Sequence, residues 1–197
     1  MRSQLIRTLA VVTAALALAA GCSAGADPGP APSSASPGVS APAPTTTAPP
    51  AGPGPLTGSG VGPYQLDAAQ DSLTSGGSLA NVTGSAGCPD FVTADATGAY
   101  AGAVSIVFFQ HKVSWIEVTS PIISTVEGAK VGMTAAQVKG LYPAAVELTG
   151  GPGKALGVSG PGAAGLLFRL NSAGAVQSIE AGRYETLEFR FTDGEGC

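Results

Sequence analysis

Charged side chains are scarce in this chain, since only 11% of its 197 residues are Asp, Glu, Lys or Arg. Histidine occurs once and cysteine three times, so the clustered His and Cys ligands of a zinc site are missing, and we expect no metal or other cofactor. Acidic residues outnumber basic ones, 13 to 9, which argues against the positive surface that nucleic-acid binding requires. We therefore expect no nucleic-acid partner.

Motifs of common catalytic sites are also missing. The single histidine, His111, falls in an expected turn, and neither a G-x-S-x-G nor a Ser-x-x-Lys motif accompanies it. Glu117 and Glu180 occupy matching places in two expected hairpins, and we interpret them as solvated strand ends rather than an acid/base pair. The Gly-rich stretches 150–153 and 160–165 are interpreted as turns, because they lack the features of a phosphate loop. We expect no enzymatic activity, and an extracellular hydrolase ranks third among the hypotheses.

The N-terminus has the pattern of an export signal. Two arginines precede the run Leu9–Ala20, which is built from Ala, Val and Leu apart from one Thr. Twelve residues are too few to span about 30 Å of hydrocarbon, but they fit the apolar part of a secretory signal peptide. We therefore expect the chain to be exported.

The end of this run, Leu-Ala-Ala-Gly-Cys at residues 18–22, resembles the bacterial lipobox. The aliphatic residue lies one place further back than in the family pattern, at Leu18. The resemblance implies a signal peptide at 1–21, acylation of Cys22, and anchoring at the extracytoplasmic face of the cell membrane. The alternative is a plain signal peptide that is cleaved near Ala20.

Composition divides the rest of the chain in two. Residues 22–55 are almost entirely Ala, Pro, Ser, Thr and Gly, a mixture that cannot bury enough apolar surface to fold. We interpret this segment as a disordered, semi-rigid tether, which lifts the domain through a wall layer or is a linker of little consequence. Residues 56–197 have the length of one domain. With Cys22 acylated and the chain exported, a Cys88–Cys197 disulfide is expected in that domain.

Two segments of this domain recur. LDAAQ at 66–70 matches MTAAQ at 133–137, and each match predicts a helix start after an N-cap, Asp67 or Thr134. V-x-x-I-E occurs at 113–117 and again at 176–180. The offsets between copies, 67 and 63 residues, favour a duplicated half-domain, with halves at about 60–120 and 121–197, over chance similarity.

Strand patterns complete the expected fold. Apolar segments at 104–109 and 165–170 precede the two V-x-x-I-E segments, so each half predicts a β-hairpin. Period-two alternation places Val113, Trp115 and Glu117 on one face, with both faces partly covered, and it places Val176, Ser178 and Glu180 together.

The last segment also alternates. Leu187, Phe189 and Phe191 alternate with polar residues, which predicts a half-exposed final strand. We thus expect an α+β fold in which duplicated helix-plus-antiparallel-hairpin units form one sheet, with short helices packed on it.

The second helix start carries a resemblance. The run VGMTAAQV at 131–138, closed by Leu-Tyr-Pro at 141–143, is similar to a helix start in uncharacterised actinobacterial secreted and lipoprotein domains. Similar starts occur in the β-lactamase inhibitor protein and in small outer-membrane assembly lipoproteins. The resemblance implies tandem α+β units with two short helices on an antiparallel sheet, and a binding rather than a catalytic role.

Aromatic residues provide the expected contact surface, and we name Trp115 and Tyr184 as candidate binding residues. The leading hypothesis is a membrane-anchored extracytoplasmic lipoprotein that acts as a non-enzymatic binding module for an envelope protein or component. The alternative is a structural envelope protein or a small-ligand carrier with a pocket between the halves.

Overall fold

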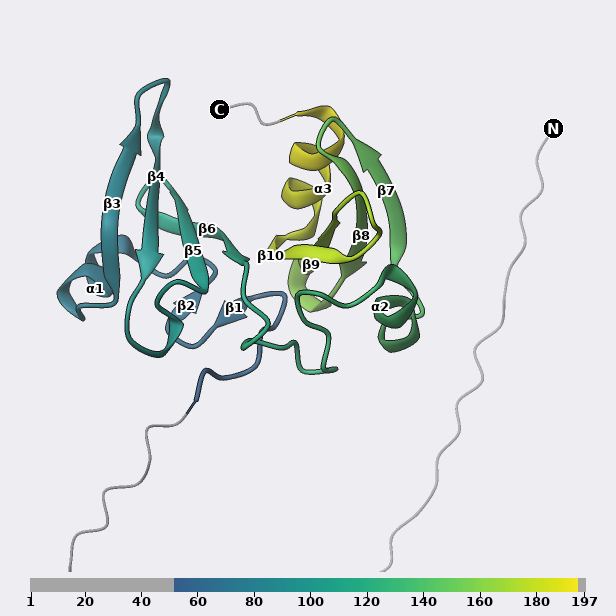
Figure 1. Ribbon diagram of the computed structural model, residues 1–197. Helices are drawn as coiled ribbons and strands as arrows, with labels where there is room; N and C mark the ends of the chain where they lie inside the picture. The colour runs from purple at the N-terminus through teal and green to yellow at the C-terminus, as the bar shows by residue number, and fades with distance from the viewer. Residues whose placement is uncertain (1–51, 195–197) are drawn as a thin grey trace, which may run out of the picture. The chain divides into compact units, whose positions relative to one another are not determined.

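Eight antiparallel strands form the main sheet of the domain (Figure 1). The computed structural model describes residues 52–194, which belong to one compact unit. The expected signal peptide, the expected acylation site Cys22, most of the expected tether, and Cys197 lie outside the described residues.

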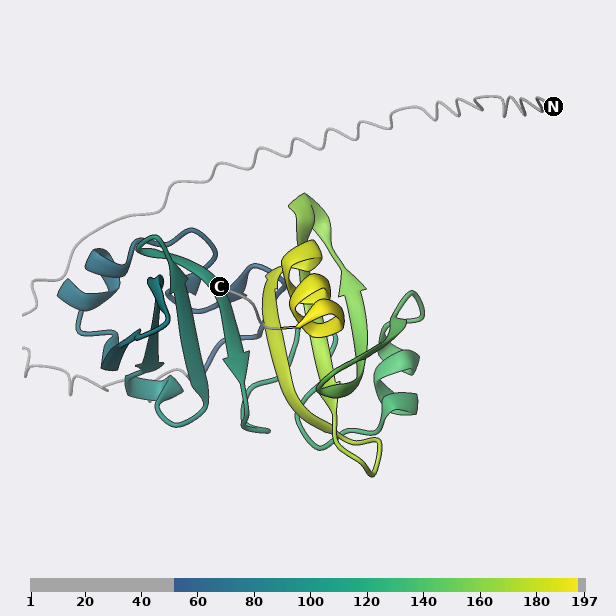
Figure 2. The same ribbon diagram turned by 90° about the horizontal axis from the view of Figure 1, so that it is seen from above.

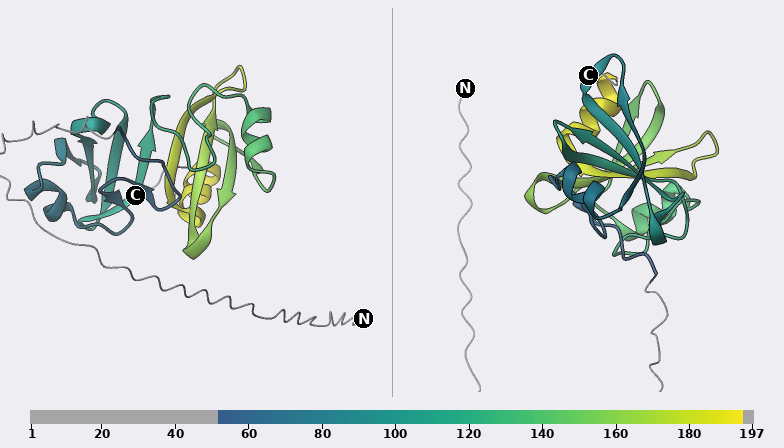
Figure 3. Two further views of the ribbon diagram at one scale, coloured as in Figure 1. Left: turned by 90° about the horizontal axis from the view of Figure 1, so that it is seen from below. Right: turned by 90° about the vertical axis from the view of Figure 1, so that its left-hand side faces the viewer.

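The strand order in this sheet is β3-β4-β5-β6-β10-β9-β8-β7. The strands are β3 (Leu79–Ser85), β4 (Cys88–Ala96), β5 (Val104–Phe109), β6 (Lys112–Val118), β7 (Val146–Gly150), β8 (Gly153–Ser159), β9 (Ala164–Leu170) and β10 (Val176–Arg183). β6 and β10 lie at the centre, with β3, β4 and β5 on one side and β7, β8 and β9 on the other (Figures 1 and 2). Figure 3 shows the strands fanning out, as the twist of antiparallel sheets requires.

Smaller elements surround the sheet. They are the two-stranded β1 (Gly60–Val61) and β2 (Tyr64–Gln65), the helices α1 (Gln70–Ser75), α2 (Ala135–Leu141) and α3 (Tyr184–Asp193), and the short 3₁₀ turns Gly98–Tyr100 and Pro161–Ala163. The fold is therefore a mixture of helices and mostly antiparallel sheet, which confirms the α+β prediction at this level.

The two predicted hairpins are present. β5 pairs with β6, and β9 pairs with β10, in both cases antiparallel. His111 lies in the first connecting turn, as expected, with a φ of 62°. The second turn is closed by Asn171, whose side-chain Oδ1 accepts hydrogen bonds from the N–H groups of Ala173 and Ala175.

A β-bulge in β6 corrects the predicted faces of this strand. Val113 pairs with Phe108 and Trp115 pairs with Val107, so Ser114 is an extra residue between them. Val107 and Phe108 are adjacent on β5, so their side chains point to opposite faces of the sheet. Their partners Trp115 and Val113 therefore also point to opposite faces, although period-two alternation had placed them on the same face. The prediction that both faces of this strand are covered agrees with the structure, because each of the two residues packs in a different apolar cluster.

The same irregularity occurs in β10. Val176 pairs with Leu170 and Ser178 with Arg169, which leaves Gln177 as the extra residue. Val176 therefore does not share a face with Ser178, contrary to the prediction. Alternation cannot reveal such a bulge, since the extra residue is defined only by the partner strand.

Each face of the sheet carries its own apolar cluster. The larger cluster includes Phe108 and Phe168 and is covered by α1 and α2 through Leu73 and Val138. The smaller cluster is on the other face and consists of Trp115, Leu148, Ala155, Leu167, Leu187 and Phe191. Within residues 52–194, α3 contacts β7, β8, β9 and β10 on this face, so the same face of β4 and β5 is less covered, and Phe109 is 41% exposed there.

The helix starts differ in how well local sequence specifies them. Thr134 caps α2 with a capping box, since its Oγ1 accepts from the Gln137 N–H and the Gln137 side chain accepts from the Thr134 N–H. This confirms the predicted N-cap. The other prediction is wrong, because α1 begins at Gln70 after Ala69, and Asp67 instead adopts a left-handed φ of 63°.

The predicted final strand is the helix α3. Leu187 and Phe191, one helical turn apart, are 0% and 3% exposed, whereas Phe189 between them is 61% exposed. A further strand beside β10 has no free edge to pair with, because β10 already pairs with β6 on one side and with β9 on the other. The chain that follows β10 must leave the sheet plane, and as a helix it satisfies its own backbone hydrogen bonds.

Candidate functional site

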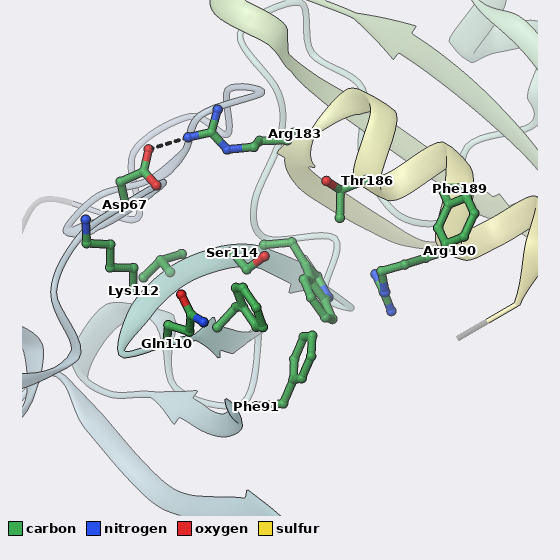
Figure 4. Close-up of a pocket in the computed structure, with 12 residues that line it drawn as sticks. Asp67, Phe91, Gln110, Lys112, Ser114, Arg183, Thr186, Phe189 and Arg190 are labelled. Atoms are coloured by element: carbon green, nitrogen blue, oxygen red, sulfur yellow. Dashed lines mark hydrogen bonds and ion pairs between the residues drawn. The ribbon is translucent and has the colours of Figure 1, made fainter. Parts of the chain in front are cut away.

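A cavity of about 470 Å³ lies between α3 and the face of β4, β5 and β6 that carries Phe91, Phe109 and Trp115 (Figure 4). Its floor is formed by Phe91, Phe109 and Trp115, and its opposite wall by Thr186, Phe189 and Arg190 of α3. We call this site the aromatic groove. The two walls come from distant parts of the sequence, and only the folded sheet brings them together.

The floor is a cluster of aromatic rings. Phe91 and Phe109 are cross-strand partners on β4 and β5, with ring centroids 5.0 Å apart. The Phe91 and Trp115 rings are 5.9 Å apart and tilted by 56°. The bulge at Ser114 places Trp115 on this face, and Phe109 remains 41% exposed. Aromatic pairs with such separations attract one another, which stabilises the packing of the floor.

A buried ion-pair network holds α3 against the floor. Glu180 on β10 is only 4% exposed, and its two carboxylate oxygens accept hydrogen bonds from Arg169 Nη1 and Arg190 Nη1, each at 3.2 Å. The guanidinium of Arg190 lies 3.7 Å from the ring centroid of Trp115, in a cation–π contact. Arg190 therefore connects α3, the sheet and the groove floor.

Glu180 contradicts the interpretation of both glutamates as solvated strand ends. Burial raises the pKa of the Glu180 carboxyl above its ordinary value, Arg190 and Arg169 oppose that shift, and Glu117 adds to it. Glu117 is half-buried and directly opposite Glu180 in the β6–β10 ladder. The two carboxylates are thus neighbours, but both oxygens of Glu180 are engaged by arginines, which makes this pair a structural element.

Charged residues lie at the rim of the groove. Arg183 Nη2 donates to Asp67 Oδ2 at 2.8 Å, and both side chains are more than half exposed (Figure 4). Lys112, at the start of β6, is also exposed. An exposed ion pair of this kind contributes little to stability, so Arg183 can exchange partners at low cost.

Of the two predicted binding residues, only Trp115 lies in the groove. Tyr184 packs over the second half of the sheet, where a Cβ on Gly157 would stand 2.6 Å from its hydroxyl and one on Gly165 would stand 2.8 Å from its Cβ. These glycines therefore accommodate the Tyr184 side chain. Burial raises the pKa of the Tyr184 phenol, in agreement with a packing role.

Sequence reasoning missed Phe91, Phe109 and Phe189 as groove residues. A signal existed for Phe109, because it alternates with Ser105 and Val107, on the less apolar face of β5. Phe189 was placed on the buried face of a strand that does not exist. Its exposure becomes apparent only with helical spacing.

The groove lining contains neither His111, the single histidine of the chain, nor Cys88. His111 is exposed, and its Nδ1 lies 3.3 Å from Gln70 Oε1. Cys88 is disulfide-bonded, and its expected partner Cys197 is outside the described residues, so that pairing stays a prediction. Among residues 52–194, no group of three or more His, Cys, Asp or Glu could hold a metal ion.

A second cavity, of about 580 Å³, lies on another part of the domain. It is lined by Leu56, Val126, Tyr142 and Leu166 among others. The Tyr142 hydroxyl donates to Glu127 there, and burial together with Glu127 raises the pKa of the Tyr142 phenol. Only one ionisable carboxylate, Glu127, lines this cavity, and no basic residue does.

No helix within residues 52–194 has the length and apolar character needed to cross a bilayer. Comparisons of the chain with protein-family models, with curated proteins and with solved structures found no match.

Proposed function

We propose that this protein is an extracytoplasmic lipoprotein, anchored through Cys22, whose domain is a non-enzymatic binding module for a protein or another component of the cell envelope. The export signal and the lipobox-like residues support the location. The aromatic groove supports the binding role. We infer that its partner contacts the uncovered half of the sheet.

The observation that carries the binding role is a pair of exposed phenylalanines, one on the floor of the groove and one on its opposite wall. Phe109 on β5 is 41% exposed and Phe189 on α3 is 61% exposed. Exposed apolar surface around a concave site is typical of interaction sites. Trp115 and Arg190 beneath it are of the residue types that dominate binding energy at interfaces.

A site-specific crosslinker tests this proposal. We expect p-benzoylphenylalanine in place of Phe189 to form a covalent adduct with a partner after irradiation of intact cells. Ile122 is equally exposed, at 61%, but does not line the groove, so the same crosslinker at Ile122 is the matched control. The readout is an adduct of higher mass on a denaturing gel. Adducts of equal yield at both positions would contradict a binding role for the groove.

The anchor has its own test. Metabolic labelling with a fatty-acid analogue is expected to tag the wild-type chain and to leave Cys22→Ala unlabelled, because only a thiol at this position can be acylated in a lipobox. Cys88→Ala is the control and should retain the label. If Cys22→Ala were labelled as strongly as the wild type, the alternative of a plain signal peptide cleaved near Ala20 would replace the anchor.

We also propose that the domain arose by duplication of a unit made of one short helix and four strands. The order α1-β3-β4-β5-β6 is followed by α2-β7-β8-β9-β10, and the last strands of the two sets, β6 and β10, are neighbours at the centre of the sheet. The two V-x-x-I-E segments carry a bulge at the same place, Ser114 and Gln177. A shared irregularity of this kind supports common origin more strongly than a shared regular strand.

Backbone hydrogen bonds support an alignment of the two halves that differs from the alignment predicted from the sequence. Val113 N–H donates to the carbonyl of Ala68, and Val176 N–H donates to that of Met133. This equates Ala68 with Met133, an offset of 65 residues instead of 67. Asp67 then corresponds to Gly132, which explains why both have a positive φ, 63° and 92°.

The groove lies where the two halves differ by one helix. The helix α3 follows β10, whereas the chain after β6 continues into the segment 119–134 without a corresponding helix. The second half of the sheet therefore has a helix on the face where the first half has none. This difference leaves Phe109 41% exposed and Phe91 half-buried beside α3.

A small-ligand carrier remains the second candidate. The observation that favours it is the cavity of about 580 Å³ between the segment Leu56–Ser59 and strands β8 and β9. A volume in this range suits a small apolar molecule. The resemblance to tandem-repeat secreted domains stays a prediction, and it is compatible with either candidate.

A further inference from the structure

Positive charge is concentrated at the aromatic groove. The described chain has seven basic residues, and three of them line the groove, namely Lys112, Arg183 and Arg190. Of the eleven acidic residues between 52 and 194, only Asp67 lines it. This distribution is opposite to that of the whole chain, whose net charge is −4. Arg190 is already paired with Glu180 and Arg183 with Asp67, so Lys112 and the exchangeable Arg183 supply the positive charge that this apolar groove offers to a ligand.

From this charge distribution we infer that the groove binds an acidic segment of a partner protein, in which an apolar side chain is flanked by carboxylates. The inference rests on the proposed binding function and specifies its ligand class. The apolar side chain packs against Phe109 and Phe189, and the carboxylates meet Lys112 and Arg183. Charge complementarity of this kind determines specificity and association rate at interfaces.

Arg183 is suited to exchange its partner. Its present carboxylate partner, Asp67, comes from the segment before α1, and their ion pair is exposed to solvent. Replacing Asp67 by a carboxylate of the ligand keeps the guanidinium paired and requires no buried charge to be created. Lys112 is on the same side of the groove as Asp67, so both cations are within reach of one bound segment (Figure 4).

The lining favours a peptide over an anionic polymer of the envelope. A phosphate-rich polymer is held mainly by many cations along its backbone. The other basic residues do not extend the groove, because Lys130, Lys139, Lys154 and Arg169 are absent from its lining. The groove instead offers three exposed or half-buried phenylalanines, which bind an apolar side chain.

Trp115 makes the inference measurable, because it is the only tryptophan of the chain and lies in the groove floor. The full-length chain in detergent is titrated with three acetylated pentapeptides, Glu-Phe-Glu-Leu-Glu and its Gln and Lys analogues, while Trp115 fluorescence is recorded. We expect the Glu peptide to bind about fivefold more tightly than the Gln peptide, and the Lys peptide not to bind. The preference should shrink between roughly 50 mM and roughly 500 mM salt.

Charge-reversal variants locate the effect. Lys112→Glu and Arg183→Glu are each expected to weaken binding of the Glu peptide about fivefold or more. Lys154→Glu makes the same charge change at an exposed site outside the groove and should leave the affinity unchanged. Circular dichroism of each variant checks that the fold is retained. An equal loss with Lys154→Glu would overturn the inference.

Other outcomes separate the inference from the proposed function. If the Glu and Gln peptides bind with equal affinity, and if Phe109→Ala abolishes the binding of both, the acidic preference is overturned while the groove remains a binding site. If inorganic polyphosphate displaces the Glu peptide, and if polyphosphate still binds Phe109→Ala, an anionic polymer replaces the acidic peptide as the ligand. Failure of all three peptides overturns the inference, whereas the crosslink at Phe189 still tests the binding role by itself.

Discussion

Replacement of Glu180 by alanine is expected to lower the free energy of unfolding by about 3–5 kcal/mol, because it leaves two partly buried guanidinium groups without their carboxylate. Arg169 and Arg190 both donate to this one side chain, and Arg169 Nε already has no hydrogen-bond partner among the described residues. The arginines would have to find water or move apart. Urea unfolding at neutral pH, followed by circular dichroism, measures the loss.

Glu147→Ala is the matched control for this prediction. Glu147 also forms an ion pair, with Lys139, but its side chain is 71% exposed. Screening by solvent makes such a pair nearly neutral for stability, so no measurable change is expected. If the two alanine variants unfolded at the same urea concentration, the buried network would not be what holds α3 on the sheet.

Leu187→Ala is expected to lower the free energy of unfolding by about 2–5 kcal/mol, because it leaves a cavity in the apolar cluster beneath α3. Leu187 is 0% exposed and packs with Trp115 and Phe191. Phe189→Ala, two residues further along, should change the free energy of unfolding by less than about 0.5 kcal/mol, because Phe189 is 61% exposed. The same urea titration compares both variants.

This pair of variants discriminates between the helix and the strand that alternation predicted. In a strand, Leu187 and Phe189 would lie on the same face and would lose similar stability on truncation. In the helix, only Leu187 faces the sheet. Similar losses for the two variants would therefore contradict the helix α3 and with it the wall of the groove.

Features encoded by neighbouring residues were predictable. The capping box of Thr134 and Gln137 lies within four residues of chain, and the turn at Asn171–Gly174 closes a hairpin whose strands are adjacent in sequence. Such contacts form with little loop entropy, so local composition specifies them. The hairpins and the start of α2 therefore agree with expectation, whereas the start of α1, capped by no side chain, differs.

The candidate site was only partly predictable. Trp115 was identified as an aromatic that could face a partner, but Phe91, Phe109 and Phe189 were not. In the sequence, each of these phenylalanines resembles an ordinary core residue. Their exposure depends on which face of the sheet α3 covers, and no local pattern contains that information.

By itself, the sequence determined the two hairpins and the capped start of α2, because these depend on residue types that are close together in the chain. The export signal with its lipobox-like cysteine and the tether are read from residue types in the same way and stay predictions. The tertiary structure decided the rest. It made the last segment a helix that packs Leu187 and Phe191 on the sheet, where β10 offers no free edge to a further strand. It also turned Trp115 away from Val113 through the bulge at Ser114, and it buried Glu180 between two arginines. These outcomes depend on partners that lie far apart in the sequence, and only the assembled sheet brings the partners into contact.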